Sequence, residues 1–153
     1  MIREDEPSGI SGEISWDKFE EDIDSFERKI RESGFDPDII IGIERGGLIP
    51  TALLAYRLRK PSASLAVIKD GESRRVVRNP LIDWKALPGI KVLLVEDRLE
   101  TGRSAQAGID ELTRSGAEVK LACISASSRT EIEPAFVLER TDREDKFPWE
   151  PRA

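Results

Sequence analysis

The chain has 153 residues, of which 39% are hydrophobic and 35% are charged, as in a globular domain. Its net charge of −6, with no basic stripe to offset it, argues against a nucleic-acid partner, and no apolar run approaches the ~20 residues of a membrane span. The absence of His and the single Cys exclude a His-dependent catalytic triad, a disulfide framework and a Cys/His zinc site.

The first predicted element is an N-terminal helix behind a flexible tail. Residues 1–13 are polar and contain Pro and Gly, so we expect a tail there and one domain over residues 14–150. The acidic start does not resemble a signal or transit peptide, and we therefore expect a cytoplasmic protein. Ser15 fits the N-cap of a helix and Gly34 the position after its end. Between them, apolar residues at spacings of three and four predict one buried helix face: Trp16, Phe19, Ile23, Phe26 and Ile30.

A buried strand and a glycine-rich turn come next. Residues 38–43 are almost continuously apolar, which is typical of a parallel strand covered on both faces. The turn after this strand reads Glu44-Arg45-Gly46-Gly47. A Gly pair lets a ligand approach the main chain, and the forked guanidinium of Arg45 suits phosphate. An ordinary loop with a solvent-facing Arg explains these residues equally well, since Gly-rich turns are common. We expect a helix over residues 51–59.

Residues 64–68 predict a short strand, and the polar residues 69–80 predict a loop. The most informative stretch follows at residues 92–104. Four apolar residues run into Glu96 and Asp97, and a Thr101-Gly102-Arg103-Ser104 turn opens a helix. Adjacent acids at the end of a strand suit vicinal hydroxyls or a hydrated cation, and a helix start offers N–H groups to phosphate. Together these features describe a sugar phosphate site.

A helix over residues 104–115 and a strand over residues 119–125 complete the pattern. Parallel strands joined by helices, with ligand loops at their carboxyl ends, predict an open, mostly parallel doubly wound α/β sheet. Cys123 lies in the apolar run Leu-Ala-Cys-Ile, so we interpret it as a core residue and not as a nucleophile.

Residues 92–104 resemble the motif of type I phosphoribosyltransferases that binds 5-phosphoribosyl-1-pyrophosphate (PRPP). Residues 41–50, Ile-Gly-Ile-Glu-Arg-Gly-Gly-Leu-Ile-Pro, resemble the pyrophosphate loop of the xanthine-guanine and archaeal hypoxanthine-guanine branch of that family. The closing Phe147-Pro148-Trp149-Glu150 is similar to the end of the same branch, whose C-terminal part forms a small hood over the base. The resemblance therefore extends over nearly all of residues 16–150.

The resemblance implies Mg²⁺-dependent transfer of the 5-phosphoribosyl group from PRPP to a nitrogenous base, with release of pyrophosphate. A 6-oxopurine is the expected acceptor and a homodimer the expected assembly. The roles it implies are ribose and Mg²⁺ binding by Glu96 and Asp97, 5′-phosphate binding by Thr101, Gly102, Arg103 and Ser104, and pyrophosphate binding by Glu44, Arg45, Gly46 and Gly47. Glu100, Arg45 and Asp97 are the expected catalytic residues, with Glu100 handling a proton of the incoming nitrogen. Residues 69–80 take the place of a mobile loop from which Arg74, Arg75 and Arg78 would reach the pyrophosphate, unless they simply face solvent.

The chain departs from this branch in its hood. Relatives carry a Lys that reads the ring oxygen of the base and an aromatic residue that stacks on it. Counted back from Pro148, these positions fall at Ser127 and Glu144, which cannot do either. Arg129 and Arg140 are possible substitutes. Ser127, Arg129 and Glu144 are therefore the candidate hood residues, and the missing groups put purine specificity in doubt.

Arg98 is a second departure, because relatives usually carry an apolar residue there. Three expectations for it are open: a pair with Glu96, a pair with Glu44, or a solvent-facing side chain.

Other interpretations of the central motif are weaker. Leu-Leu-Val-Glu-Asp also resembles the first strand of a receiver domain, but too few residues follow Asp97 to complete one. No Gly-x-x-x-x-Gly-Lys-Ser/Thr is present, and a buried strand that ends in a solvated acidic turn is the plainest alternative. Three functions remain open: transfer to a 6-oxopurine, transfer to a different nitrogen acceptor, and a non-catalytic PRPP- or nucleotide-binding regulatory protein.

Overall fold

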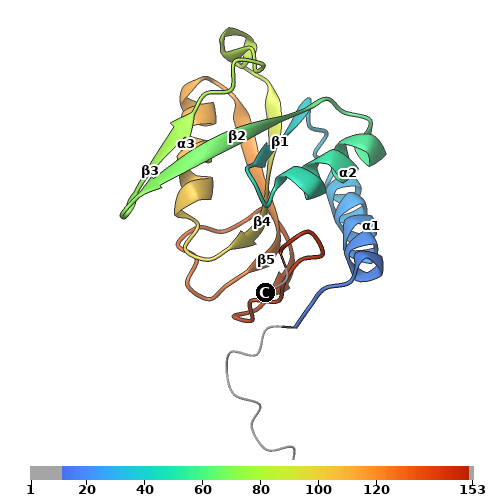
Figure 1. The fold of residues 1–153 in the computed structure, drawn as a ribbon. Helices are drawn as coiled ribbons and strands as arrows, with labels where there is room; N and C mark the ends of the chain where they lie inside the picture. Colours follow the sequence, from blue (N-terminus) through green and yellow to red (C-terminus); the bar gives the residue numbers. More distant parts are fainter. Residues whose placement is uncertain (1–11, 152–153) are drawn as a thin grey trace, which may run out of the picture.

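One six-stranded sheet, in the order β3-β2-β1-β4-β5-β6, carries helices on both faces (Figure 1). The computed structural model describes residues 12–151, so residues 1–11 of the expected tail lie outside the described part. In chain order the elements are α1 (Trp16–Ser33), β1 (Ile39–Ile43), α2 (Leu48–Leu58), β2 (Ser62–Asp70), β3 (Ser73–Val77), the 3₁₀ helix η1 (Trp84–Ala86), β4 (Lys91–Leu99), α3 (Arg103–Arg114), β5 (Glu118–Ala126) and β6 (Phe136–Arg140). Only the β2–β3 pair is antiparallel, which confirms the predicted mostly parallel, doubly wound sheet.

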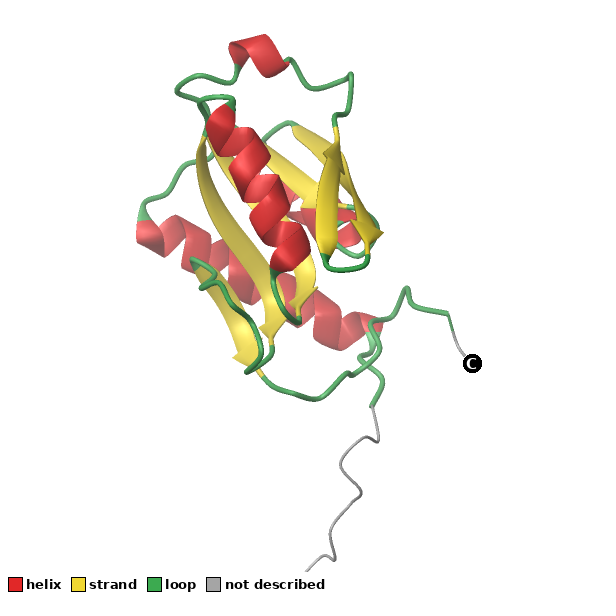
Figure 2. Ribbon diagram, turned by 90° about the vertical axis from the view of Figure 1, so that its left-hand side faces the viewer, coloured by secondary structure: helices red, strands yellow, loops and turns green. Residues whose placement is uncertain are grey.

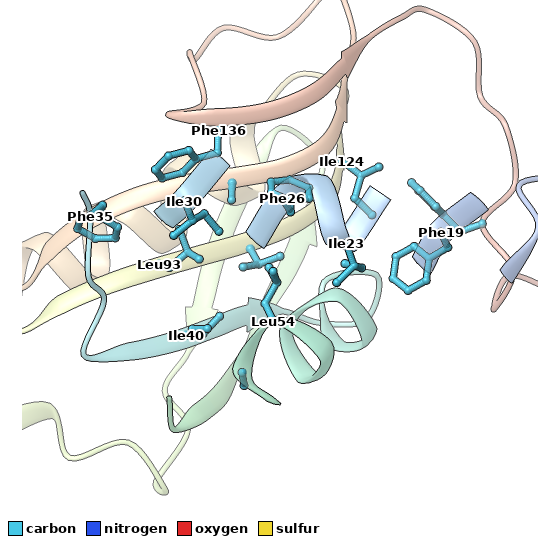
Figure 3. Packing of buried hydrophobic residues seen from close by; sticks show 14 residues of the cluster. Phe19, Ile23, Phe26, Ile30, Phe35, Ile40, Leu54, Leu93, Ile124 and Phe136 are labelled. Atoms are coloured by element: carbon cyan, nitrogen blue, oxygen red, sulfur yellow. The ribbon is translucent and has the colours of Figure 1, made fainter. Parts of the chain in front are cut away.

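The predicted N-terminal helix is confirmed as α1. The Ser15 hydroxyl accepts a hydrogen bond from the Lys18 N–H over 3.0 Å, and Gly34 ends the helix with a φ of 77°. Four residues of the predicted apolar face pack with residues of α2, β1, β4 and β5 in one buried cluster (Figure 3), namely Phe19, Ile23, Phe26 and Ile30. The prediction is wrong for Trp16, which is 55% exposed because it begins the helix at the edge of this cluster. A second cluster lies under α3 on the opposite face of the sheet, and Figure 2 shows α3 crossing that face. Apolar burial on both faces is what holds the central strands in place.

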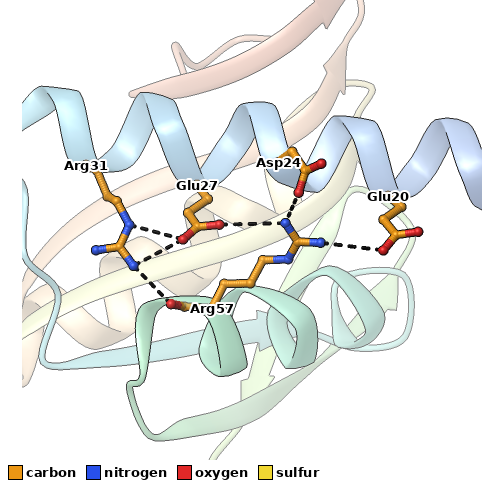
Figure 4. A network of polar contacts seen from close by, with 5 residues as sticks. All are labelled: Glu20, Asp24, Glu27, Arg31 and Arg57. Atoms are coloured by element: carbon orange, nitrogen blue, oxygen red, sulfur yellow. Dashed lines mark hydrogen bonds and ion pairs between the residues drawn. The ribbon is translucent and has the colours of Figure 1, made fainter.

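Polar contacts add to the apolar packing between α1 and α2 (Figure 4). Arg57 of α2 pairs with three acids of α1, which are Glu20, Asp24 and Glu27. Arg31 donates to the Arg57 carbonyl over 3.0 Å. Pairs this exposed contribute little stability individually, so we regard them as fixing the angle between the helices.

Two element boundaries differ from the prediction by three residues or more. Helix α2 begins at Leu48 and not at residue 51, because Pro50 falls in the first turn, where its missing N–H costs no hydrogen bond. Strand β4 continues to Leu99 because β5 still pairs with it beyond the end of β1. β6 and η1 were not predicted at all.

The prediction of a loop over residues 69–80 is wrong for its first part, where β2 and β3 form a hairpin. Asp70 pairs with Ser73 across a two-residue turn, and Gly71 takes a φ of 59° there. A Gly at the first position of a two-residue turn is a hairpin signal, and Gly71 after Asp70 was present in the sequence.

The two ends of the described chain lie together. The Gly12 N–H donates to Asp145 over 2.7 Å, and Glu13 forms an isolated parallel bridge with Lys146. Gly12 and Glu13 therefore do not belong to a loose tail, in contrast to the prediction for residues 1–13. Among the described residues, no helix is both long and apolar enough to cross a bilayer.

Candidate functional site

The two acids of the central motif lie within β4 and not in a turn after it. β1 pairs with β4 only as far as Val95, whereas β5 continues beside Glu96 and Arg98. Both Glu96 and Asp97 are therefore half-buried beside the point where β1 stops, and both line one cavity.

Burial shapes the charge of this pair. It raises the pKa of Glu96 well above its usual value, and the neighbouring charge of Asp97 raises it further. Burial also raises the pKa of Asp97, although the N–H and the charge of Arg98 oppose the effect. Two carboxylates held this way favour a partner that brings hydroxyl protons or positive charge.

The glycine pair brings the turn after β1 against β4. A Cβ on Gly46 would lie 2.0 Å from an oxygen of Asp97, and a Cβ on Gly47 would lie 2.3 Å from the Val95 carbonyl. Only Gly fits at either position. The Glu44–Arg45 peptide of this turn is cis. Glu44 lines the cavity and accepts from Ser64 over 2.7 Å, whereas the Arg45 side chain is exposed and does not line it.

The predicted phosphate loop opens α3. Gly102 is its N-cap, with a φ of 82°, and no side chain caps this end of the helix. The Gln106 N–H already bonds to the Gly102 carbonyl over 2.8 Å, so the N–H groups of the first turn, at Ser104 and Ala105, have no partner within the helix. Both residues line the cavity, and the positive end of the α3 dipole faces it. Arg103 also lines the cavity, and its guanidinium pairs with Glu131 at 3.3 Å.

The cavity has a volume of about 340 Å³. Its polar lining comes from five parts of the chain, namely Glu44, Lys69, Arg74, the stretch from Glu96 to Arg98 and the loop from Glu100 to Ser104. Among the described residues no group of three or more acids, Cys or His is placed to hold a metal ion.

Lys69 is a site residue that the sequence analysis missed. It is the last but one residue of β2, opposite Arg74 of β3, and both side chains line the cavity. Alternation along β3 leaves Arg75 exposed on the other face. Arg78 is held elsewhere, 2.7 Å from Glu111 and 4.6 Å above the ring of Trp84. Of the three candidate arginines of this region, the structure brings only Arg74 to the cavity.

The candidate hood residues do not line this cavity. Ser127 is buried and donates to the Glu100 carbonyl over 2.8 Å, so it anchors the phosphate loop. Arg129 and Glu144 lie 3.7 Å apart as an exposed ion pair. Arg140 pairs with Glu133. The C-terminal hood therefore has an arginine–glutamate ion pair, whereas the resemblance led us to look for a lysine and an aromatic ring.

Arg98 follows none of the three expectations for it. It pairs with neither Glu96 nor Glu44, and its side chain donates to the Asp145 carbonyl at the C-terminal segment. Cys123 is fully buried in β5, and burial raises its pKa to about 12, which confirms it as a core residue.

Comparison with known proteins agrees with this geometry. A model of the phosphoribosyl transferase domain matches residues 15–153. The chain belongs to this family. A purine phosphoribosyltransferase from Pyrococcus horikoshii superposes with a TM-score of 0.82 at 30% identity, over 94% of this chain and 95% of that one.

Sequence relatives differ in the base they are named for. An orotate phosphoribosyltransferase from Pyrobaculum aerophilum is 33% identical over 57% of this chain and 43% of its own length. A xanthine-guanine phosphoribosyltransferase from Chromohalobacter salexigens is 32% identical over 61% of this chain and 57% of its own. The chain thus spans about half the length of the curated relatives it matches.

Proposed function

We propose that this protein transfers the 5-phosphoribosyl group of PRPP to a nitrogenous base and releases pyrophosphate, with a 6-oxopurine as acceptor. The observation that carries the proposal is that the half-buried acid pair and the uncapped start of α3 line one cavity. Carboxylates accept hydrogen bonds from the two hydroxyls of a ribose, and free N–H groups donate to a phosphate. A site that holds both kinds of group side by side suits a ribose phosphate. The family match supports the same chemistry.

PRPP fits this cavity in one direction. Its ribose hydroxyls donate to Glu96 and Asp97, and its 5′-phosphate accepts from the N–H groups and hydroxyls of residues 101–104. Its pyrophosphate then points to the turn at Glu44–Gly47, with Lys69 and Arg74 as cationic partners from the hairpin. Arg45 is exposed in that turn and reaches the pyrophosphate only after its side chain moves.

The donor set fits a magnesium ion brought by the substrate. Mg²⁺ in such sites takes one or two carboxylates and completes its shell with water and phosphate oxygens, and Glu96 and Asp97 supply that number. Two half-buried acids whose pKa values are raised also gain from a neighbouring cation. When bound, Mg²⁺ neutralises charge on the departing pyrophosphate.

The reaction is a displacement at the anomeric carbon. The bond from that carbon to the pyrophosphate oxygen breaks, a bond to the base nitrogen forms, and the electron pair leaves with pyrophosphate. Asp97 holds the ribose, Arg45 meets the negative charge of the leaving group, and Glu100, exposed at the rim of the cavity, accepts a proton from the base. Preorganised charge and positioning supply most of the acceleration.

A different nitrogen acceptor is the second candidate. The Pyrococcus horikoshii protein supports a purine, whereas relatives named for orotate and adenine match about equally well. The hood favours the alternative, because Ser127 is tied to Glu100 and the Arg129–Glu144 pair replaces the lysine and the ring. An arginine paired with a glutamate offers both donors and acceptors to a base edge, but no stacking surface.

We propose a homodimer as the assembly. Leu48 is 38% exposed and Tyr56 is 84% exposed on α2, which leaves apolar surface on this helix for a second copy to cover.

The deciding experiment measures pyrophosphate release from PRPP and Mg²⁺ with guanine, xanthine, hypoxanthine, adenine, orotate and uracil. Release with guanine, xanthine or hypoxanthine supports the purine assignment, and release with only orotate or uracil favours the alternative. No release with any base, from a protein that binds PRPP, would leave a non-catalytic PRPP-binding protein.

A further inference from the structure

Arg98 connects the acid pair to the C-terminal segment, residues 141–150. Its own N–H donates to Asp97 Oδ1 over 2.6 Å, whereas its Nη2 donates to the Asp145 carbonyl. The carbon at the centre of its guanidinium lies 4.9 Å from the centroid of the Phe147 ring. One residue thus touches both the carboxylate that we assign to the ribose and a segment 47 residues further along the chain.

The surface on which Arg98 rests is itself held firmly. Phe147 is buried and stacks parallel to Trp149, with ring centroids 4.8 Å apart. Trp149 in turn meets the edge of Phe19 of α1 at 4.8 Å. A guanidinium that lies on such a platform has few alternative positions, so its hydrogen bond fixes the Asp145 carbonyl relative to β4.

Stability does not explain an arginine at this position. Its Nε is buried and has no hydrogen-bond partner in the part of the chain that the structure describes. The same is true of the Ser125 hydroxyl, the register partner of Arg98 on β5, and both residues line a cavity of about 300 Å³ beneath the C-terminal segment. A buried donor without a partner is destabilising, and an apolar side chain would avoid that loss.

The segment that Arg98 holds leads directly to Arg129 and Glu144, the hood residues that the proposed function relates to the acceptor base. Asp145 follows Glu144, which pairs with Arg129, and Asp142 accepts from the Ser128 N–H over 2.8 Å. Residues 142–145 therefore run from the contact with Arg98 to the loop that starts at Ser127. Any shift of the Asp145 carbonyl moves the neighbouring Glu144.

We propose that Arg98 is a positioning residue that holds residues 142–145 in place and thereby sets the affinity for the acceptor base. This inference rests on the proposed function and adds to it a residue that controls acceptor binding without touching the base. Arg98 also lines the proposed PRPP cavity, but its guanidinium is engaged by the Asp145 carbonyl and the Phe147 ring. PRPP binding therefore depends on Arg98 less, because the backbone N–H that orients Asp97 is present whatever the side chain.

The test compares Arg98→Leu, Arg98→Lys and the control Arg114→Gln, each with the base that supports turnover. Loss of a hydrogen bond from a charged donor predicts that R98L raises the KM of the base about tenfold or more. The Kd of PRPP with Mg²⁺, measured by calorimetry, should stay within about twofold, well under the tenfold of one such hydrogen bond. R98K should restore part of the affinity, since its ammonium keeps a donor for the Asp145 carbonyl. R114Q should match the wild type, because Arg114 is exposed in the last turn of α3 and pairs with Glu111 of the same helix.

Thermal unfolding and trypsin cleavage separate positioning from a structural role. R98L should keep or raise Tm, because a buried unpaired donor is removed, and trypsin should cut faster after Arg143 or Lys146. A lower Tm with every kinetic constant impaired would overturn the proposal, as would an unchanged KM for the base. An inactive wild type would remove the proposed function and this role together, whereas an active wild type with a normal R98L would remove only the role of Arg98.

Discussion

The Asp97 carboxylate lies against Gly46, so the proposed ribose and pyrophosphate parts of the site are in contact within the protein itself. A side chain on Gly46 would occupy the place of that carboxylate. The acid pair and the turn therefore form one unit, although 50 residues separate Gly47 from Asp97 in the chain.

Asp97→Asn keeps the size of the side chain and removes its charge. Loss of a charged hydrogen bond to the ribose predicts about 10–100-fold weaker PRPP binding, with an unchanged fold. Calorimetry and circular dichroism measure the two quantities. Asp110→Asn, on the exposed face of α3, is the matched control. PRPP affinity like that of the wild type in D97N would remove the assignment of the ribose site.

Glu96→Gln should make the ligand-free protein more stable at pH 8 but not at pH 4. The raised pKa of Glu96 means that its protonated form is the one favoured in the folded protein. That stabilising effect is complete below the ordinary Glu pKa of 4.5 and is lost as pH rises through the raised value. E96Q should therefore melt a few degrees higher at pH 8, since about 1 kcal/mol corresponds to roughly 2–4 °C for a chain of this size. Equal Tm values for E96Q and wild type at both pH values would contradict this account.

At the scale of the elements, the β2–β3 hairpin places two positively charged side chains at the cavity, one from each strand. Lys69 and Arg74 are opposite each other in the register of the two strands, and both line the cavity, whereas Arg75 points away. Because side chains alternate between the two faces, Arg75 serves as a control for the residues of the same hairpin that line the cavity.

Lys69→Gln should weaken pyrophosphate binding about tenfold, since it removes one charge-assisted contact, and Arg75→Gln should leave it unchanged. Product inhibition by pyrophosphate measures both constants under the same conditions. A similar loss in the two variants would mean that the hairpin acts only through its overall positive charge.

The elements also show how far local patterns reach. The apolar spacing of α1 and the continuous apolar run of β1 were sufficient to predict them, because burial on one or two faces dictates that spacing. β6 was missed because Phe136–Arg140 has only its first residue buried and is a strand through pairing with β5. The hairpin was missed although Gly71 of its turn was visible, because charged residues obscured the alternation.

At the scale of the whole molecule, the proposed dimer is tested through its exposed apolar surface. Tyr56→Glu should convert a particle of twice the 17.1 kDa chain mass into a monomer, because a charge would be buried at the contact. Leu81→Glu changes an equally exposed side chain, 89% accessible, outside α2 and is the control. Sedimentation equilibrium distinguishes the two species. A wild-type monomer would rule out the dimer, and an intact dimer in Y56E would rule out this face.

The sequence by itself determined the type of sheet and the positions of the two turns at the proposed ligand site, because a buried parallel strand, a glycine pair and a helix start are local features with local signatures. Only the tertiary structure decided which charges share the cavity. It brought Lys69 and Arg74 to the acid pair, took Arg78 to Trp84, and joined Arg98 to Asp145. These outcomes depend on strand register and on contacts between distant segments, and a one-residue change of register would turn each such side chain to the opposite face.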